Sequence, residues 1–208
     1  MNTPSLIIGM LSLSCAAIGA AAEPSLLSNV EVRIVGGPAP GYDSGYGDGD
    51  KRIGSNGELL ALYHQPLGTS PLGMVLGIGL FDDGRRAKAN NPDNVTEYDA
   101  QGIVVTGGVS YAVMPKLSLE ARAEVRGGEG RFSAQQTFAN GNYEVLGNYG
   151  RYIAGSAVAA VYYTFPFAMT LGLEAGYDDF IGKSDYINND LTLKGDGLLV
   201  RAGIGYRF

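Results

Sequence analysis

The chain has no tryptophan, a single cysteine, a single histidine and no block of basic residues. Its 15 Lys and Arg residues are outnumbered by 21 Asp and Glu residues, which gives a formal net charge of −6. Binding of a phosphate backbone needs clustered Lys and Arg, so this balance argues against nucleic acid as a partner. One cysteine, Cys15, cannot form an intramolecular disulfide. One histidine, His64, leaves a single candidate base for Ser–His–acid catalysis.

Long apolar runs are confined to the N-terminus. Residues 6–22 are apolar apart from two serines and end in three alanines. Small residues at the −1 and −3 positions predict a secretory signal peptide, residues 1–22, removed after Ala22. Because residues 1–5 carry no Lys or Arg, a misassigned start or an uncleaved anchor stays open. Lipidation of Cys15 is disfavoured, because the lipoprotein signal pattern has Leu at the position that Ser12 occupies here.

After residue 22, no apolar stretch approaches the ~18 residues that a membrane-spanning helix needs. In lipid, only helices and closed barrels satisfy every backbone group. If residues 23–208 sit in a membrane, they therefore do so as a barrel, and their number argues for one domain.

The dominant period of the mature chain is two, which is the period of a β-strand. In residues 198–208, Leu, Val, Ala, Ile, Tyr and Phe alternate with residues that are mostly Gly and Arg. The 32 glycines disfavour long helices, and together with 13 tyrosines they suit strands and tight turns. The same alternation runs through 72–81, 103–113, 117–126 and 169–178, and less clearly through 30–35, 58–64 and 152–165.

The connections sort into two lengths that alternate strictly along the chain. Three are short, at 65–71, 114–116 and 166–167; four are long and rich in Gly, Asn and Asp, at 37–55, 82–99, 128–149 and 179–196. Outer-membrane barrels have an even strand number, short periplasmic turns and longer extracellular loops. The sequence therefore predicts an all-β fold, an eight-stranded antiparallel up-and-down transmembrane β-barrel with four long extracellular loops and both termini at the short-turn end.

The closing strand carries a resemblance. Residues 199–208 resemble the C-terminal strand of bacterial outer-membrane β-barrel proteins, in which a terminal Phe and apolar residues at every second position serve as an assembly signal. The matching residues are Phe208, Tyr206, Ile204 and Ala202. With its four hairpins, the chain is similar to the small barrels of the OmpA and OmpX type and to the broad "outer membrane protein beta-barrel domain" family.

That resemblance implies a place in the cell outer membrane of a Gram-negative bacterium. It implies contact with outer-membrane lipid and lipopolysaccharide, and with the outer-membrane assembly machinery through the C-terminal strand. We expect a monomer.

The inward phase of the predicted strands is unusually charged. An eight-stranded barrel has an interior just wide enough for side chains to fill, so we expect opposite charges to pair there and plug the lumen. The register around the last hairpin sets Glu174 opposite Arg201. The inward glycines leave open a narrow porin-like channel for small or hydrophobic solutes. The charged inward residues are Glu31, Arg33, Glu58, Glu120, Arg122, Glu124, Arg126, Glu174 and Arg201.

Other candidate motifs favour a structural role over a catalytic one. Glu120 and Glu124 share a face as hydrolase carboxylates do, but Arg122 lies between them. His64 falls at the periplasmic end of the second strand and has no accompanying His-x-Ser pattern, so a lipid A-modifying enzyme is the last of the alternatives. We expect a non-enzymatic barrel, without catalytic residues or cofactor, that contributes to envelope integrity or to surface interaction through its loops.

Two acidic pairs bear on metal binding. The segments 48–50 (Asp-Gly-Asp) and 178–179 (Asp-Asp) offer oxygen ligands of the type that calcium prefers, but neither has the spacing of a calcium loop. We therefore assign no metal site, and weak divalent binding at the loops stays open.

Overall fold

A computed structural model describes residues 29–42, 51–88, 95–138, 141–186 and 189–208. The predicted signal peptide, Cys15 and the acidic segment 48–50 lie outside these residues. No helix in the described part of the chain is long and apolar enough to cross a membrane. The strands are β1 (Val30–Ala39), β2 (Lys51–Pro66), β3 (Leu72–Lys88), β4 (Val95–Met114), β5 (Leu117–Phe138), β6 (Gly141–Leu146), β7 (Gly150–Thr164), β8 (Met169–Tyr186) and β9 (Asn189–Arg207).

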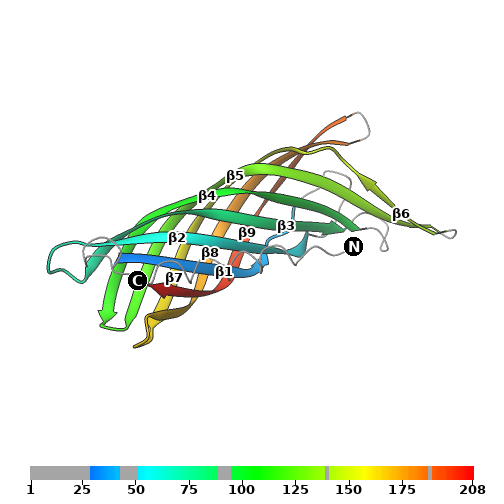
Figure 1. Cartoon of the computed structure of the whole chain (residues 1–208). Helices are drawn as coiled ribbons and strands as arrows, with labels where there is room; N and C mark the ends of the chain where they lie inside the picture. The colour runs from blue at the N-terminus through cyan, green and yellow to red at the C-terminus, as the bar shows by residue number, and fades with distance from the viewer. Residues whose placement is uncertain (1–28, 43–50, 89–94, 139–140, 187–188) are drawn as a thin grey trace.

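The strands form one antiparallel sheet that closes on itself (Figure 1). Its order is β4-β3-β2-β1-β9-β8-β7-β5-β6, and β4 also pairs with β5. The short strand β6 pairs with the outer end of β5, beyond the wall. Eight strands therefore make the wall of the barrel, which confirms the predicted fold.

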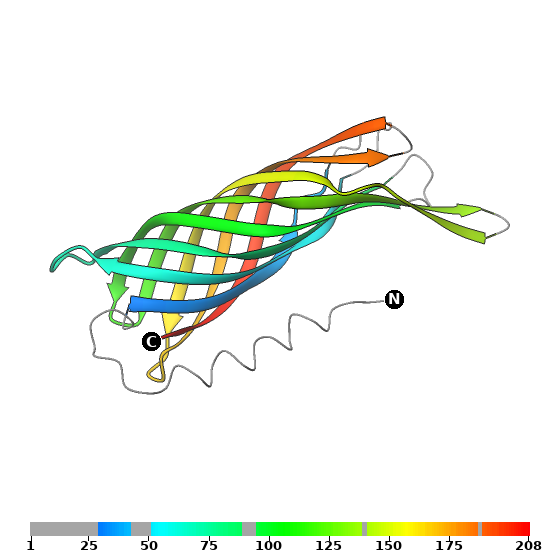
Figure 2. The same ribbon diagram turned by 45° about the horizontal axis from the view of Figure 1, so that its top comes forward.

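The ring closes where the first strand meets the last. β1 pairs with β9 from Glu31, opposite Arg207, to Gly36, opposite Ala202. The amide of Phe208 donates a hydrogen bond of 2.9 Å to the carbonyl of Val30. The start of β1 and the end of β9 lie at the end that carries the short turns (Figure 2), as the sequence predicts.

The sequence overestimates the length of the four long loops. Most of the described residues in these predicted loops continue the strands instead. β3 runs to Lys88 rather than to residue 81, and β5 runs to Phe138 rather than to residue 126. Composition rich in Gly, Asn and Asp indicates a loop only where the backbone lacks a partner. Here the extensions stay paired with their hairpin neighbours, as at Asp83 and Ala100. Above the lipid a strand needs no apolar outer face, so polar residues fit the ladder.

The outer surface of the wall is an apolar band. On β3 the outward residues Leu76, Ile78 and Leu80 are 49%, 58% and 60% exposed, and the next outward residue is Asp82. Soluble proteins rarely expose a continuous apolar surface of this size, whereas a barrel with an apolar exterior and a polar lumen is stable in lipid. The wall is therefore built to span a membrane. Similar exposed residues on other strands are Ile103, Val105, Val109, Leu119, Val125, Leu171, Leu173, Val200 and Ile204.

Candidate functional site: the filled lumen

All nine charged residues predicted to face inward lie inside the barrel, and each is at most 3% exposed. Three more join them: Asp83, Arg85 and Asp178, all fully buried. The alternation that places Phe81 inward also places Asp83 and Arg85 inward, so extending the predicted strand would have found both. Asp178 has the same inward phase as Glu174. We call these twelve residues the lumenal network.

The layer near the short turns is built around Arg33. Its guanidinium donates two hydrogen bonds to Glu120, of 2.8 and 3.0 Å, and one to Glu31, of 2.7 Å. The Arg33 guanidinium carbon also lies 3.6 Å from the centroid of the Tyr162 ring. Bidentate, charge-assisted pairs of this kind fix both geometry and charge. The layer ties β1 to β5 and β7 across the lumen.

The middle layer is built around Arg201. Its guanidinium donates to Glu58 at 2.7 Å, to both oxygens of Glu124 at 2.8 and 2.9 Å, and to Glu174 at 2.9 Å. The cross-strand pair of Glu174 with Arg201, which the sequence register predicts, is present. Arg122 lies beside them and pairs with Glu120, Glu124 and Glu174. Three carboxylates thus share one guanidinium, and the layer joins four strands.

The outer layer holds two arginines between two aspartates. Arg85 donates to Asp83 at 2.9 Å and to Asp178 at 2.6 Å. Arg126 pairs with the same two aspartates. The Tyr152 hydroxyl also donates to Asp83. Because Asp178 is already held by two guanidinium groups, it is a poor candidate for calcium.

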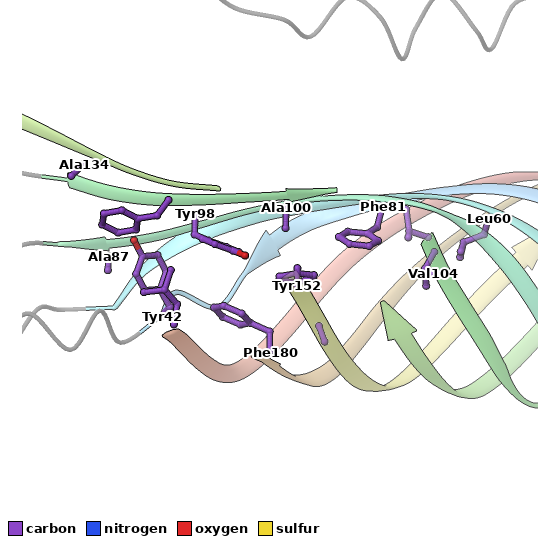
Figure 3. Packing of buried hydrophobic residues seen from close by; sticks show 14 of the residues in the cluster. Tyr42, Leu60, Phe81, Ala87, Tyr98, Ala100, Val104, Ala134, Tyr152 and Phe180 are labelled. Atoms are coloured by element: carbon purple, nitrogen blue, oxygen red, sulfur yellow. The ribbon is translucent and has the colours of Figure 1, made fainter. Parts of the chain in front are cut away.

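Aromatic side chains pack together inside the barrel (Figure 3), and the Phe180 ring lies 4.7 Å from the guanidinium carbon of Arg85 in the outer layer of the network. Tyr152 stacks on Tyr98 at 6.1 Å and on Phe180 at 5.8 Å between ring centroids, and contacts Phe81 at 5.4 Å. Tyr42 meets Phe180 edge-on. Burial raises the pKa of Tyr98 to about 12, so its hydroxyl stays protonated and donates to the carbonyl of Lys183 at 3.2 Å. We call these five residues the aromatic layer.

Large side chains lie over several of the inward glycines. A Cβ at Gly172 or Gly203 would overlap the Tyr162 side chain, and one at Gly130 or Gly182 would overlap Tyr98. These glycines therefore make room for side chains of the lumen. They favour a filled interior over an aqueous path.

His64 lies at the short-turn end of the lumen, next to a structural carboxylate. Its Nε2 is 3.0 Å from Oε2 of Glu31, which also accepts a 3.0 Å hydrogen bond from Arg207. The other Glu31 oxygen accepts from Thr170 at 2.7 Å. Glu31 thus joins β1 to β2, β8 and β9. In the described residues, no group of three or more His, Cys, Asp or Glu side chains is arranged to hold a metal ion.

The fold and the filled lumen define a class, the small eight-stranded transmembrane β-barrel of the kind found in bacterial outer membranes. Comparisons with protein-family models and with curated proteins find no match.

Among solved structures, the chain is similar to Neisserial surface protein A (NspA), with 16% identity over 87% of this chain and 98% of that chain and a TM-score of 0.48. It is also similar to Ail, the attachment invasion locus protein of Yersinia pestis, with 14% identity over 87% and 99% of the two chains and a TM-score of 0.43. For Ail in complex with the heparin analogue sucrose octasulfate, the identity is 15% over 86% and 98%, with a TM-score of 0.42. At these values we transfer no ligand or partner to this chain.

Proposed function

We propose that this chain is a non-enzymatic barrel of the bacterial outer membrane, closed along its lumen, that acts as a rigid support for surface hairpins. The apolar wall and the short turns at the end that carries both strand termini support this placement. The terminal residues Phe208, Tyr206, Ile204 and Ala202 are proposed to be read by the assembly machinery. Contact with outer-membrane lipid and lipopolysaccharide follows from the same placement, and the working form is a monomer.

The filled lumen carries this proposal. The lumenal network joins strands on all sides of the barrel, and the aromatic layer packs against its outer layer. An aqueous path would need these ion pairs to separate in a confined space, and unpaired buried charges are costly. A closed lumen makes the barrel stiff, which suits a support and does not suit a channel.

Among the residues that the structure describes, two hairpins project beyond the wall and provide a surface for interaction (Figures 1 and 2). One is formed by β5 and β6, which pair from Ser133, opposite Leu146, to Phe138, opposite Gly141. The other is formed by β8 and β9, which pair as far as Tyr186, opposite Asn189. Continuous strand pairing holds each of these segments as a two-stranded ribbon. The barrel therefore presents ordered hairpins to its surroundings. Envelope integrity and surface interaction are the roles that such a body can perform.

Conductance separates this proposal from the narrow channel. Purified protein reconstituted into a planar lipid bilayer should give no large, stable current steps, because the ion pairs of Arg33 and Arg201 block the lumen. Flotation of the same protein with lipid vesicles verifies insertion. Long-lived openings of porin size would replace the support role with the channel role.

A further inference from the structure

The outer wall has a shallow hollow on one flank, with a volume of about 640 Å³. The same level of β3 carries Leu76 and Ile78, whereas most of the outward residues here, apart from Val109, are small. They lie next to one another across the sheet, since Gly107 faces Ala123 and Ala123 faces Ala157. The small outward residues lining the hollow are Gly107, Ala121, Ala123, Ala157, Ala159 and Ala175, from β4, β5, β7 and β8.

Four cations lie higher on the outward face of the same flank: Arg131, Arg151, Lys183 and Lys194, from β5, β7, β8 and β9. The pairing of Tyr152 with Gly182 makes Arg151 and Lys183 neighbours, and Lys194 faces the residue two before Lys183. All but Arg131 are exposed. No ion pair to a carboxylate holds any of the four within the described ranges.

Carboxylates are also present on this flank, and Asp99 faces Arg131 directly across the β4–β5 pair. Glu129 faces Arg151 across the β5–β7 pair, and Asp179 faces Asp196 across the β8–β9 pair. Asp196 accepts a hydrogen bond from the Tyr177 hydroxyl. On their own strands, Arg131, Lys183 and Lys194 lie farther from the apolar band than Glu129, Asp179 and Asp196.

The distance between the cations and the hollow matches half a bilayer. Arg151 lies six residues along β7 from Ala157, and Lys183 lies eight along β8 from Ala175. At ~3.3 Å per residue these separations are roughly 20–26 Å along the strand, or about 15–20 Å along the membrane normal for strands tilted by ~40°. Half of a ~30 Å hydrocarbon core is ~15 Å, so the cations lie at headgroup height when the hollow lies near mid-membrane.

We propose that this flank binds a phosphorylated, multiply acylated lipid of the lipid A type in the outer leaflet. Arg151, Lys183 and Lys194 hold its phosphates, with Arg131 at the edge, because charge-assisted contacts to phosphate are strong next to a low-dielectric membrane. One acyl chain fills the hollow, where the small outward residues leave room for it. The inference rests on the outer-membrane placement proposed above.

Native mass spectrometry of the full-length barrel in detergent tests this directly. With diphosphorylated, six-chain lipid A as the probe, the wild type should retain one lipid, more tightly at low than at high salt. The triple variant Arg151→Ala, Lys183→Ala, Lys194→Ala should bind about a hundredfold more weakly and lose the salt dependence. Filling the hollow with Ala123→Leu and Ala157→Leu should weaken binding roughly tenfold, because about two methylene groups lose their place.

Matched controls come from the opposite flank. Arg86→Ala removes an exposed outward cation of β3, and Ala61→Leu enlarges an exposed outward alanine of β2. Neither should change lipid A retention. Equal losses in these controls would overturn the proposal. So would equal retention of lipid A and phosphatidylethanolamine, or a lipid-free dimer that disappears on filling the hollow. A barrel that is folded and non-conducting but shows no preference for lipid A would refute this inference and leave the support role intact.

Discussion

At the scale of the residue, the lumen works because every arginine in the lumenal network has more than one carboxylate partner. Arg201 contacts Glu58, Glu124 and Glu174, and Arg85 contacts Asp83 and Asp178. Taking charges out of water is costly, and only good geometry with several hydrogen bonds offsets that cost. Removal of a single partner therefore does more damage than the mean strength of one ion pair suggests.

Arg201 offers the sharpest test of that logic. Arg201→Met replaces arginine with another unbranched side chain that has no charge. It therefore leaves three buried carboxylates without their shared cation. We expect the free energy of unfolding in urea, measured on barrels in lipid vesicles, to fall by at least ~3–5 kcal/mol. Arg86→Met breaks the exposed 2.9 Å pair with Glu97 and should cost only ~0–1 kcal/mol. Equal unfolding midpoints for the two variants would show that the lumenal network does not stabilise the fold.

Residue phase alone identifies nine of the twelve members of this network. It misses Asp83 and Arg85 because the predicted strand ends at residue 81, although both keep the inward phase. Asp178 lies in the predicted strand 169–178 with inward phase, but the prediction treats it as part of an acidic pair beside a loop. The aromatic layer escapes prediction for a different reason. Tyr98 belongs to a segment whose composition is typical of a loop, and the contact of Tyr152 with Phe180 depends on packing across the lumen, which no local pattern encodes.

At the scale of the element, the sequence predicts strands only where lipid imposes an apolar outer face. Residues 72–80 alternate clearly because the outward positions meet lipid. Residues 82–88 alternate as well, but between exposed polar and buried residues such as Asp82 and Asp83. The physical cause of the strand is the same backbone ladder, and only the outer solvent changes. Strand ends beyond a membrane are therefore poorly predicted from hydropathy.

The end of the last strand allows a test of the proposed assembly signal. The backbone N–H of Phe208 donates a hydrogen bond to the carbonyl of Val30. The centroid of the Phe208 ring lies 5.1 Å from that of the Tyr206 ring. If the terminal Phe is the assembly signal, deleting it should shift protein from the outer membrane to the periplasm, measured by fractionation and immunoblotting. Phe167→Ala, which removes an exposed Phe from the β7–β8 turn at the same end of the barrel, should assemble normally. Normal assembly of the truncated chain would remove the role assigned to Phe208.

At the scale of the whole molecule, stability comes from closure. A closed sheet has no free edge in the wall, so detergent finds no row of unpaired backbone groups at which to start unfolding. Closure depends on the contact between β1 and β9. Glu31 reinforces that contact, because its carboxylate accepts hydrogen bonds from Arg33, Thr170 and Arg207 and lies 3.0 Å from Nε2 of His64.

A detergent gel tests closure and the role of Glu31 together. Unheated wild type should migrate differently from boiled protein, because the closed barrel persists in detergent at room temperature. Glu31→Ala leaves Arg33 and Arg207 without this partner at the junction, so conversion to the unfolded band should begin at a temperature lower by roughly 10 °C, as a loss of ~3–5 kcal/mol implies for a chain of this size. Glu129→Ala removes an exposed outward carboxylate of β5 and should leave the conversion temperature unchanged. A wild type that migrates identically before and after boiling would contradict the closed barrel, and an unshifted Glu31→Ala would assign closure to the backbone ladder alone.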